Sequence, residues 1–303
     1  MKFNKRRNMP KNQYATMNIV MAADYSYKIQ VETVMKSILQ YHTKVQFFLI
    51  NKDYPKEWFV YINEKLNIFD SCIMDKKITP ILYKNFKTFD HISEATFYRY
   101  HIPELIEEDK VLYLDSDILI VADLSSLYNS DIAHTSLAAV RDANLKNVFN
   151  AGMLLINNRK WREKNVLSRA LSIHEQSDDA LTFADQDVLN ILFENEWLEM
   201  PDRYNMQIFG GKLDLKRYTV PADAVVIHYL TAIKPWSTYK KTIKSRLGRL
   251  YRIVAAYVSG RDRRYPLRIA LKNRETLPFE KKWHQLSQLS WEDFVENNRN
   301  AKN

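Results

Sequence analysis

The sequence of 303 residues contains a single cysteine, Cys72. One cysteine cannot form an internal disulfide framework or a zinc site built from several thiolates, and this usage is typical of the reducing cytosol. The chain also has only five glycines, and they form neither a Gly-x-Gly-x-x-Gly pattern nor a P-loop. We therefore expect neither a standard dinucleotide-binding fold nor a Walker-type nucleoside triphosphatase.

Long hydrophobic runs are absent as well. No run approaches the roughly 18 apolar residues that a membrane-spanning helix needs, and we identify no secretory signal peptide. With 46% hydrophobic and 27% charged residues, the composition is typical of a soluble globular protein with a large core. These features predict a cytosolic protein.

The net charge of +9 is distributed unevenly along the chain. Residues 1–17 carry five basic and no acidic residues, whereas residues 236–303 carry 16 Lys/Arg against six Asp/Glu, so residues 18–235 have a net charge of −6. This pattern predicts a basic N-terminal arm (1–17), an acidic globular domain (18–235) and a basic C-terminal region (236–303). Because the body is acidic, we expect no nucleic-acid partner, and we expect the basic ends to contact an anionic surface.

Apolar runs alternate with segments of helical spacing. Residues 18–23 and 45–50 are predicted strands, residues 31–39 have the 3–4 spacing of a helix, and a second helix is predicted to start at Pro55. Further strands are predicted at 111–114, 137–140, 153–156 and 224–227, and a further helix at 188–193. This alternation predicts an α/β fold with a mainly parallel sheet flanked by helices.

A pair of carboxylates, Asp115 and Asp117, directly follows the apolar run 111–114. Residues i and i+2 of an extended segment point to the same side, and ligands of parallel sheets bind beyond the carboxyl ends of strands. An isolated Asp-x-Asp is more often a turn or a helix cap, but the apolar runs on both sides of this one favour a site for Mg²⁺ or Mn²⁺.

His228 follows a second apolar run, and Lys234 lies six residues further on. A histidine in this position is most often structural. Together with the two aspartates, however, it offers an imidazole for a metal and a lysine for a phosphate. Such a set would stabilise the charge on a departing diphosphate.

Seven segments in order support a resemblance to a known family: NIVMAADYSY (18–27), HISEATFYRYHIPELI (91–106), KVLYLDSDILI (110–120), FNAGMLLINNRKWR (149–162), ADQDVLNILF (184–193), MPDRYNMQ (200–207) and HYLTAIKPW (228–236). The chain resembles the bacterial family 8 retaining glycosyltransferases of the GT-A fold, a group that includes lipopolysaccharide galactosyl- and glucosyltransferases. The resemblance covers residues 18–236 and implies that 18–235 is a GT-A catalytic domain.

The resemblance implies a site for a UDP-sugar and Mn²⁺ (or Mg²⁺). The residues it assigns to the nucleotide, the diphosphate and the metal are Ala22, Ala23, Asp24, Ser26, Arg99, Asp115, Ser116, Asp117, His228, Thr231 and Lys234. Asp115, Asp117 and His228 match the metal ligands, and Lys234 matches a diphosphate contact. Two positions depart from the family pattern: Ser26 stands where relatives often have asparagine, and Thr231 where they usually have glycine.

The resemblance also implies a pocket for the transferred sugar, formed by Asp142, Asn150, Ala151, Gly152, Asp185 and Gln186. Without it, Asn150–Gly152 would be interpreted as a turn and Asp185 as a helix cap. Asp185 and Gln186 are the implied catalytic residues, with Gln186 beneath the reacting carbon. Because an amide is a poor nucleophile, we favour front-face attack over double displacement.

Residues 241–258 have apolar side chains at helical spacing with basic residues between them. The pattern predicts a basic amphipathic helix that lies on an anionic membrane, with Trp236, Trp283 and Trp291 as interfacial aromatics. The alternative is a helix that packs on the catalytic domain.

The function predicted from the sequence is a metal-dependent, retaining transfer of galactose or glucose from UDP-galactose or UDP-glucose. The acceptor would be a hydroxyl of a cell-surface glycan, a lipopolysaccharide (glycolipid) or a glycoprotein glycan, and the enzyme would be cytoplasmic and peripheral at the inner face of the cell membrane. Two alternatives remain: a non-catalytic protein of this fold that binds an anionic membrane or nucleic acid, and a nucleotidyltransferase.

Overall fold

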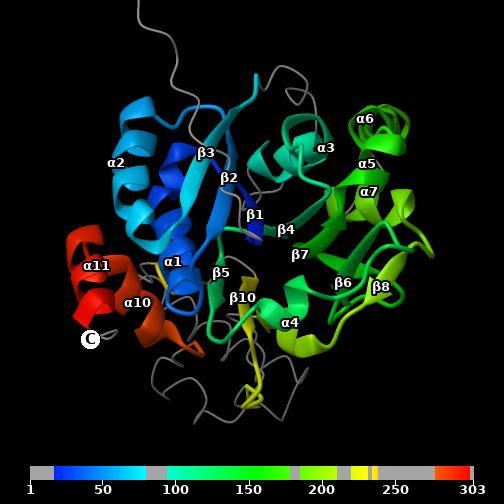
Figure 1. The fold of residues 1–303 in the computed structure, drawn as a ribbon. Coiled ribbons are helices and arrows are strands. Elements are labelled where there is room, and N and C mark those ends of the chain that lie inside the picture. The colour runs from blue at the N-terminus through cyan, green and yellow to red at the C-terminus, as the bar shows by residue number, and fades with distance from the viewer. Residues whose placement is uncertain are drawn as a thin grey trace, which may run out of the picture.

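The computed structural model describes residues 17–79, 94–177, 185–209, 220–230, 234–237 and 277–300 (Figure 1). These ranges form two sheets, with helices on both faces of the larger one. Three sequence predictions lie outside them: the N-terminal arm up to residue 16, the role of Thr231, and the basic helix at 241–258.

The larger sheet has seven strands in the order β3-β2-β1-β4-β7-β6-β8. Their bounds are β1 (Met17–Ala22), β2 (Val45–Asn51), β3 (Cys72–Lys77), β4 (Lys110–Leu114), β6 (Leu137–Arg141), β7 (Phe149–Asn157) and β8 (Trp197–Glu199). Strands β3, β2, β1 and β4 are parallel, β7 is antiparallel to β4 and β6, and β8 is parallel to β6. The predicted α/β fold with a mainly parallel sheet is confirmed.

Helices cover both faces of this sheet. The helices are α1 (Lys28–Leu39), α2 (Lys56–Leu66), α3 (Ile102–Leu105), α4 (Ser125–Tyr128), α5 (Asn158–Glu163), α6 (Val166–Ser177), α7 (Asp185–Leu192), α10 (Glu280–Gln288) and α11 (Trp291–Asn300), with the short 3₁₀ helices η1 (Tyr25–Tyr27), η2 (Asn67–Phe69), η4 (Glu94–His101) and η5 (Asp202–Tyr204). In β1, Ile19 and Met21 pack into the core under α1 and α2, whereas Val20 and Ala22 pack into the core under η4, α6 and α7. Both faces of the strand are buried, which explains its continuous apolar run.

The pairing of β1 with β4 places two predicted site segments at one edge of the sheet. Val20 lies opposite Tyr113 in this parallel pair. The chain therefore leaves β1 at Ala22 and leaves β4 at Leu114 on the same side of the molecule. This is the edge at which ligands bind in open parallel sheets.

A second sheet, in the order β5-β10-β9, lies beside this edge. Its strands are β5 (Ile118–Ile120), β9 (Met206–Phe209) and β10 (Val226–Leu230). The predicted strand at 224–227 is shifted along the chain, because antiparallel pairing with β5 continues through His228, which lies opposite Ile118. His228 is therefore within a strand rather than beyond its end, and this register brings it next to Asp117.

The C-terminal helices α10 and α11 pack against α1 and α2 (Figure 1). The Lys36 ammonium of α1 is buried and donates to the carbonyl of Leu289, at 2.6 Å, just beyond the end of α10. Trp283 and Trp291 belong to the core that α1 shares and are only 3% and 2% exposed. The prediction that these two tryptophans are interfacial aromatics is wrong, because their rings fill the space between the helical pair and the sheet domain. Within the described ranges, no helix has the length and apolar character needed to cross a membrane.

Candidate functional site

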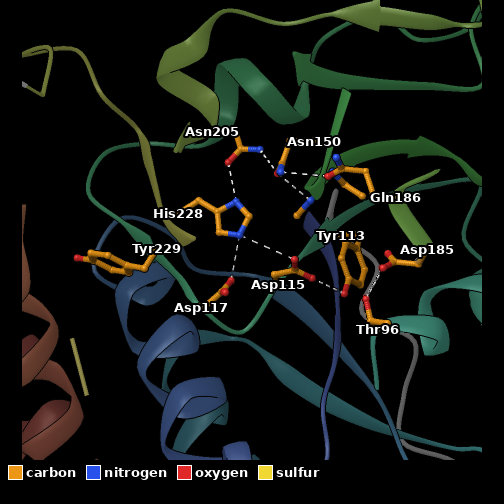
Figure 2. A network of polar contacts seen from close by, with 12 residues as sticks. Thr96, Tyr113, Asp115, Asp117, Asn150, Asp185, Gln186, Asn205, His228 and Tyr229 are labelled. Atoms are coloured by element: carbon orange, nitrogen blue, oxygen red, sulfur yellow. Dashed lines mark hydrogen bonds and ion pairs between the residues drawn. The ribbon is translucent and has the colours of Figure 1, made fainter. Parts of the chain in front are cut away.

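Asp115, Asp117 and His228 meet at one point (Figure 2). Asp115 follows β4, Asp117 precedes β5 and His228 lies in β10, yet one ligand atom from each lies within 4.8 Å of the others. His228 Nε2 is 3.1 Å from Asp117 Oδ1 and 3.9 Å from Asp115 Oδ2. Two carboxylates and one imidazole nitrogen therefore face a common centre.

This centre fits a divalent cation. Asp117 Oδ1 is buried and accepts no hydrogen bond from any described residue, although His228 Nε2 is close. A buried carboxylate oxygen without a donor is unfavourable unless a cation compensates it. The predominance of oxygen ligands with one imidazole suits Mn²⁺ or Mg²⁺.

Gly152 in β7 lies directly against this group. A Cβ at this position would be 2.2 Å from His228 Cε1 and 2.9 Å from Asp115 Oδ2. Both distances are far below van der Waals contact, so any larger residue would displace the histidine or the aspartate. Close packing of two site side chains therefore requires glycine here.

Lys234 lies on the other side of Asp117. Its Nζ is 2.6 Å from Asp117 Oδ2 and also donates to the carbonyl of Tyr229. Burial alone would raise the pKa of the Asp117 carboxyl, but positive charge beside it, first that of the Lys234 ammonium, outweighs burial and holds that pKa well below its ordinary value. Asp117 is thus kept ionised, as a metal ligand must be.

Arg99, at the end of η4, is a fully buried cation beneath Asp115. Its guanidinium donates to Asp115 Oδ1 at 2.9 Å, to the Ala151 carbonyl at 2.6 Å and to the Thr96 carbonyl at 3.0 Å. Burial would lower the pKa of this guanidinium, but Asp115 and Asp185 raise it above its ordinary value, so it stays charged. Arg99 therefore holds a metal-ligating carboxylate and the backbone of β7 together.

Asp185, the first residue of α7, shares this cation. Its Oδ2 is 3.1 Å from Arg99 Nε, and its Oδ1 accepts a hydrogen bond from Thr96. The side chain is buried, which raises the pKa of its carboxyl, and Arg99 offsets this only in part. One arginine thus pairs with two carboxylates from separate elements.

The predicted sugar-pocket residues Asp142, Asn150, Ala151 and Gln186 form one hydrogen-bonded cluster. Figure 2 shows two of them, Asn150 and Gln186. Gln186 Oε1 accepts from the Ala151 N–H at 3.1 Å and from Asn150 Nδ2 at 3.2 Å, while Gln186 Nε2 donates to Asp142 Oδ2 at 3.2 Å. Because a backbone N–H can only donate, it fixes the orientation of the Gln186 amide.

The loop after β1 carries the residues predicted to contact the base and ribose. Asp24 Oδ1 accepts from the Ser26 N–H at 3.0 Å and from the Ser26 hydroxyl, and so caps η1. The pairing of β1 with β4 places this loop at the edge that also carries Asp115 and Asp117. Partial burial, and then the carboxylates of Asp117 and Asp24, raise the pKa of Tyr27 in this loop. Ala22 and Ala23 are buried at the strand end, and Ser116 is half-buried between the two aspartates.

Three residues that contact this site were not selected from the sequence. Tyr113 donates to Asp115 Oδ1 at 2.7 Å, Thr96 donates to Asp185, and Asn205 Oδ1 lies 3.0 Å from His228 Nδ1. Tyr113 sits two residues before Asp115, so strand alternation could have identified it. Asn205 belongs to the MPDRYNMQ segment, but no local pattern indicates which residue it faces.

Comparison with known proteins identifies this arrangement with one family. The model described as "Glycosyl transferase family 8" matches residues 18–240. The chain is 34% identical over 242 residues to glycosyltransferase GlyF of Streptococcus pneumoniae serotype 4, an alignment that covers 78% of this chain and 61% of GlyF. The chain thus spans about three fifths of the length of this relative.

Solved structures show the same fold. The structure is similar to that of glycosyltransferase GlyE of Streptococcus pneumoniae TIGR4, with a TM-score of 0.71 and 26% identity over 95% of this chain and 64% of that one. It is also similar to the galactosyltransferase LgtC in complex with donor and acceptor sugar analogues, with a TM-score of 0.65 and 26% identity over 83% of this chain and 98% of that one.

Proposed function

The chain belongs to glycosyltransferase family 8, and we propose that it transfers galactose or glucose from a UDP-sugar to a glycan hydroxyl, with retention of anomeric configuration. The fold is GT-A, as in the solved glycosyltransferases it resembles. The observation that carries the proposal is the convergence of Asp115, Asp117 and His228 beside Lys234 at the carboxyl edge of the sheet.

The donor would lie across this edge. Ala22, Ala23, Asp24 and Ser26 would contact the uracil and ribose, with Ser116 against the ribose. Asp115, Asp117 and His228 would hold Mn²⁺ or Mg²⁺, which when bound would compensate the negative charge of the diphosphate. Lys234 would bind the departing diphosphate, because its ammonium already lies within this group of charges. Thr231 is outside the described residues, and its diphosphate contact stays a prediction.

The transferred hexose would occupy the cluster of Asp142, Asn150, Ala151, Gly152 and Gln186, whose carboxylate and amide groups suit sugar hydroxyls. The galactosyltransferase LgtC, solved with donor and acceptor sugar analogues, supports a hexose donor. Pocket geometry rather than residue type distinguishes galactose from glucose, so both donors are included in the proposal.

We favour front-face attack, in which an oxygen of the UDP phosphate accepts the proton of the acceptor hydroxyl. Two observations support it. The Gln186 carbonyl oxygen already accepts two hydrogen bonds, and an amide is a poor nucleophile. The Asp185 carboxylate is buried between Thr96 and Arg99, which disfavours it as a nucleophile. A covalent glycosyl adduct on Asp185 or Gln186, detected by mass spectrometry, would contradict this mechanism.

We place Arg99 beneath the donor pocket as the cation that positions Asp115 and Asp185. Its side chain is only 4% exposed, and three of its N–H groups donate to Asp115, Ala151 and Thr96. Its predicted contact with the diphosphate or the donor sugar stays a prediction.

The test of this function is the release of UDP from a panel of UDP-sugars, with Mn²⁺ and with a chelator. We expect slow hydrolysis of UDP-galactose or UDP-glucose that stops when the metal is removed, because the site then loses the charge that stabilises the leaving diphosphate. Release of pyrophosphate instead of UDP would identify a nucleotidyltransferase. If UDP does not bind at all, the proposed function is wrong.

The acceptor is proposed to be a lipopolysaccharide, a cell-surface glycan or a glycoprotein glycan, reached from the cytoplasmic face of the membrane.

Residues 238–276 carry 12 Lys/Arg and two Asp/Glu, so most of the basic charge of the C-terminal region precedes the packed helices α10 and α11 in the sequence. We expect the protein to sediment with vesicles that contain phosphatidylglycerol at low salt and to be released at high salt, because each basic residue near such a surface contributes about 1 kcal/mol. Neutral phosphatidylcholine vesicles are the control. Equal sedimentation with both, or with neither, would contradict the membrane proposal.

A further inference from the structure

Asn205 is a buried polar residue behind the metal-ligating group. It directly precedes β9 and is 1% exposed. Its side chain makes two contacts: Nδ2 donates to Asn150 Oδ1 at 2.8 Å, and Oδ1 lies 3.0 Å from His228 Nδ1 (Figure 2). The second contact uses Nδ1, the ring nitrogen that does not face Asp115 and Asp117.

The direction of these hydrogen bonds follows from a backbone group. The Gly152 N–H, which can only donate, lies 3.1 Å from Asn150 Oδ1 and so makes that atom an acceptor. Asn205 must then turn its amide nitrogen toward Asn150 and its carbonyl oxygen toward His228. An amide oxygen can only accept, so His228 Nδ1 must carry a proton. We call this series, from the Gly152 N–H through Asn150 and Asn205 to His228, the amide relay.

We propose that Asn205 is a positioning residue for the metal site, which holds the proton of His228 on Nδ1 and directs the lone pair of Nε2 toward Asp115 and Asp117. A histidine that ligates a metal through one ring nitrogen commonly donates from the other, and that partner fixes the ring orientation. The relay starts at the glycine that packs against the same imidazole, so the backbone of β7 sets both the position and the protonated nitrogen of His228.

The relay also touches the proposed sugar pocket. Asn150 Nδ2 donates to Gln186 Oε1 at 3.2 Å and reaches Asp142 Oδ2 at 3.5 Å. These acceptors use the nitrogen of the Asn150 amide, which leaves its oxygen for Gly152 and Asn205. The orientation of the Asn150 amide is thus fixed from both sides, and it fixes the orientation of the Asn205 amide in turn.

This inference rests on the proposed metal-dependent function, and its test compares Mn²⁺ binding among variants without any donor or turnover. Asn205→Ala removes both contacts. Asn205→Asp keeps an acceptor for the Nδ1 proton and loses the donor to Asn150. Measured by electron paramagnetic resonance of free Mn²⁺, we expect Asn205→Ala to weaken Mn²⁺ binding about 10- to 100-fold and Asn205→Asp to stay within a few fold of the wild type.

Asn158→Ala is the matched control. Asn158 is fully buried, and its Nδ2 donates to the carbonyls of Ile106 at 2.8 Å and Glu108 at 2.9 Å, remote from the metal-ligating group. Its loss should lower the free energy of unfolding but leave Mn²⁺ affinity unchanged. A merely structural role for Asn205 would give the same pattern as this control.

A second readout is the ring nitrogen that carries the proton, from long-range ¹H–¹⁵N spectra of the metal-free protein with labelled histidine, under conditions where the ring is neutral. We expect Nδ1–H in the wild type and a shift to Nε2–H in Asn205→Ala. Wild-type Mn²⁺ affinity in Asn205→Ala, or an equal loss in the control variant, would overturn the role of Asn205 alone. Absence of Mn²⁺ binding by the wild type would instead overturn the metal-dependent function and this inference with it.

Discussion

Asp117→Asn should lower the rate of metal-dependent UDP release by about a thousandfold or more. Asp117 faces His228 Nε2 at 3.1 Å and Lys234 Nζ at 2.6 Å, so one carboxylate serves both the metal site and the proposed diphosphate site. Loss of a metal's stabilisation of the leaving group removes several kcal/mol, and each 1.36 kcal/mol corresponds to about a tenfold change in rate. The measurement is the initial rate of UDP release at saturating Mn²⁺ and UDP-sugar.

The control for this experiment is Asp131→Asn. Asp131 is an exposed aspartate whose Oδ1 accepts from the Ala133 N–H at 2.9 Å, and asparagine can make the same contact. Its activity should match the wild type. Asp117→Asn activity within tenfold of the wild type would show that Asp117 is not a ligand on which turnover depends.

Arg99→Met should lower the free energy of unfolding by about 3–5 kcal/mol, because it removes the shared cation and leaves two carboxylates without it in a buried site. Asp115 and Asp185 lie 2.9 and 3.1 Å from the guanidinium, whose side chain is only 4% exposed. Methionine has a similar length, so the loss would come from the charge and the donors rather than from a cavity. Urea denaturation monitored by circular dichroism gives this free energy.

Arg141→Met is the matched control for Arg99. Arg141 also pairs with a carboxylate, through Nε to Glu199 Oε1 at 3.0 Å, but this pair is exposed to solvent. Exposed pairs contribute little to stability, so the loss should be much smaller than at Arg99. Equal losses in the two variants would mean that Arg99 stabilises the fold only as a surface pair does.

Much of the fold and of the candidate site could be predicted from the sequence because local patterns encode them. The apolar run at 18–23 predicted the strand β1, and the spacing of apolar residues predicted α1. Asp185 stands at the start of α7, where the sequence placed a helix N-terminus. Asp115 and Asp117 lie close together because both belong to the short connection between β4 and β5, which is a local property of the chain.

The sequence could not predict the contacts between distant segments. Lys234 and Asp117 form an ion pair although 117 residues separate them. The register of β10 against β5 puts His228 inside a strand, and strand register depends on the partner strand rather than on the apolar run itself. The environment of Trp283 and Trp291 also depends on distant segments. The sequence pattern of an amphipathic helix is the same whether its apolar side contacts a membrane or a protein core, and the two tryptophans were therefore misassigned.

The sequence by itself therefore determined the α/β class, the carboxylate pair after a strand and, through the resemblance it carries, the family. Only the tertiary structure decided how the side chains share their partners: Arg99 between Asp115 and Asp185, Asp117 between His228 and Lys234, and Asn205 between Asn150 and His228. The physical reason is that hydrogen bonds and ion pairs act over a few ångströms. Which groups come that close is set by strand order and register, through contacts between residues far apart in the chain.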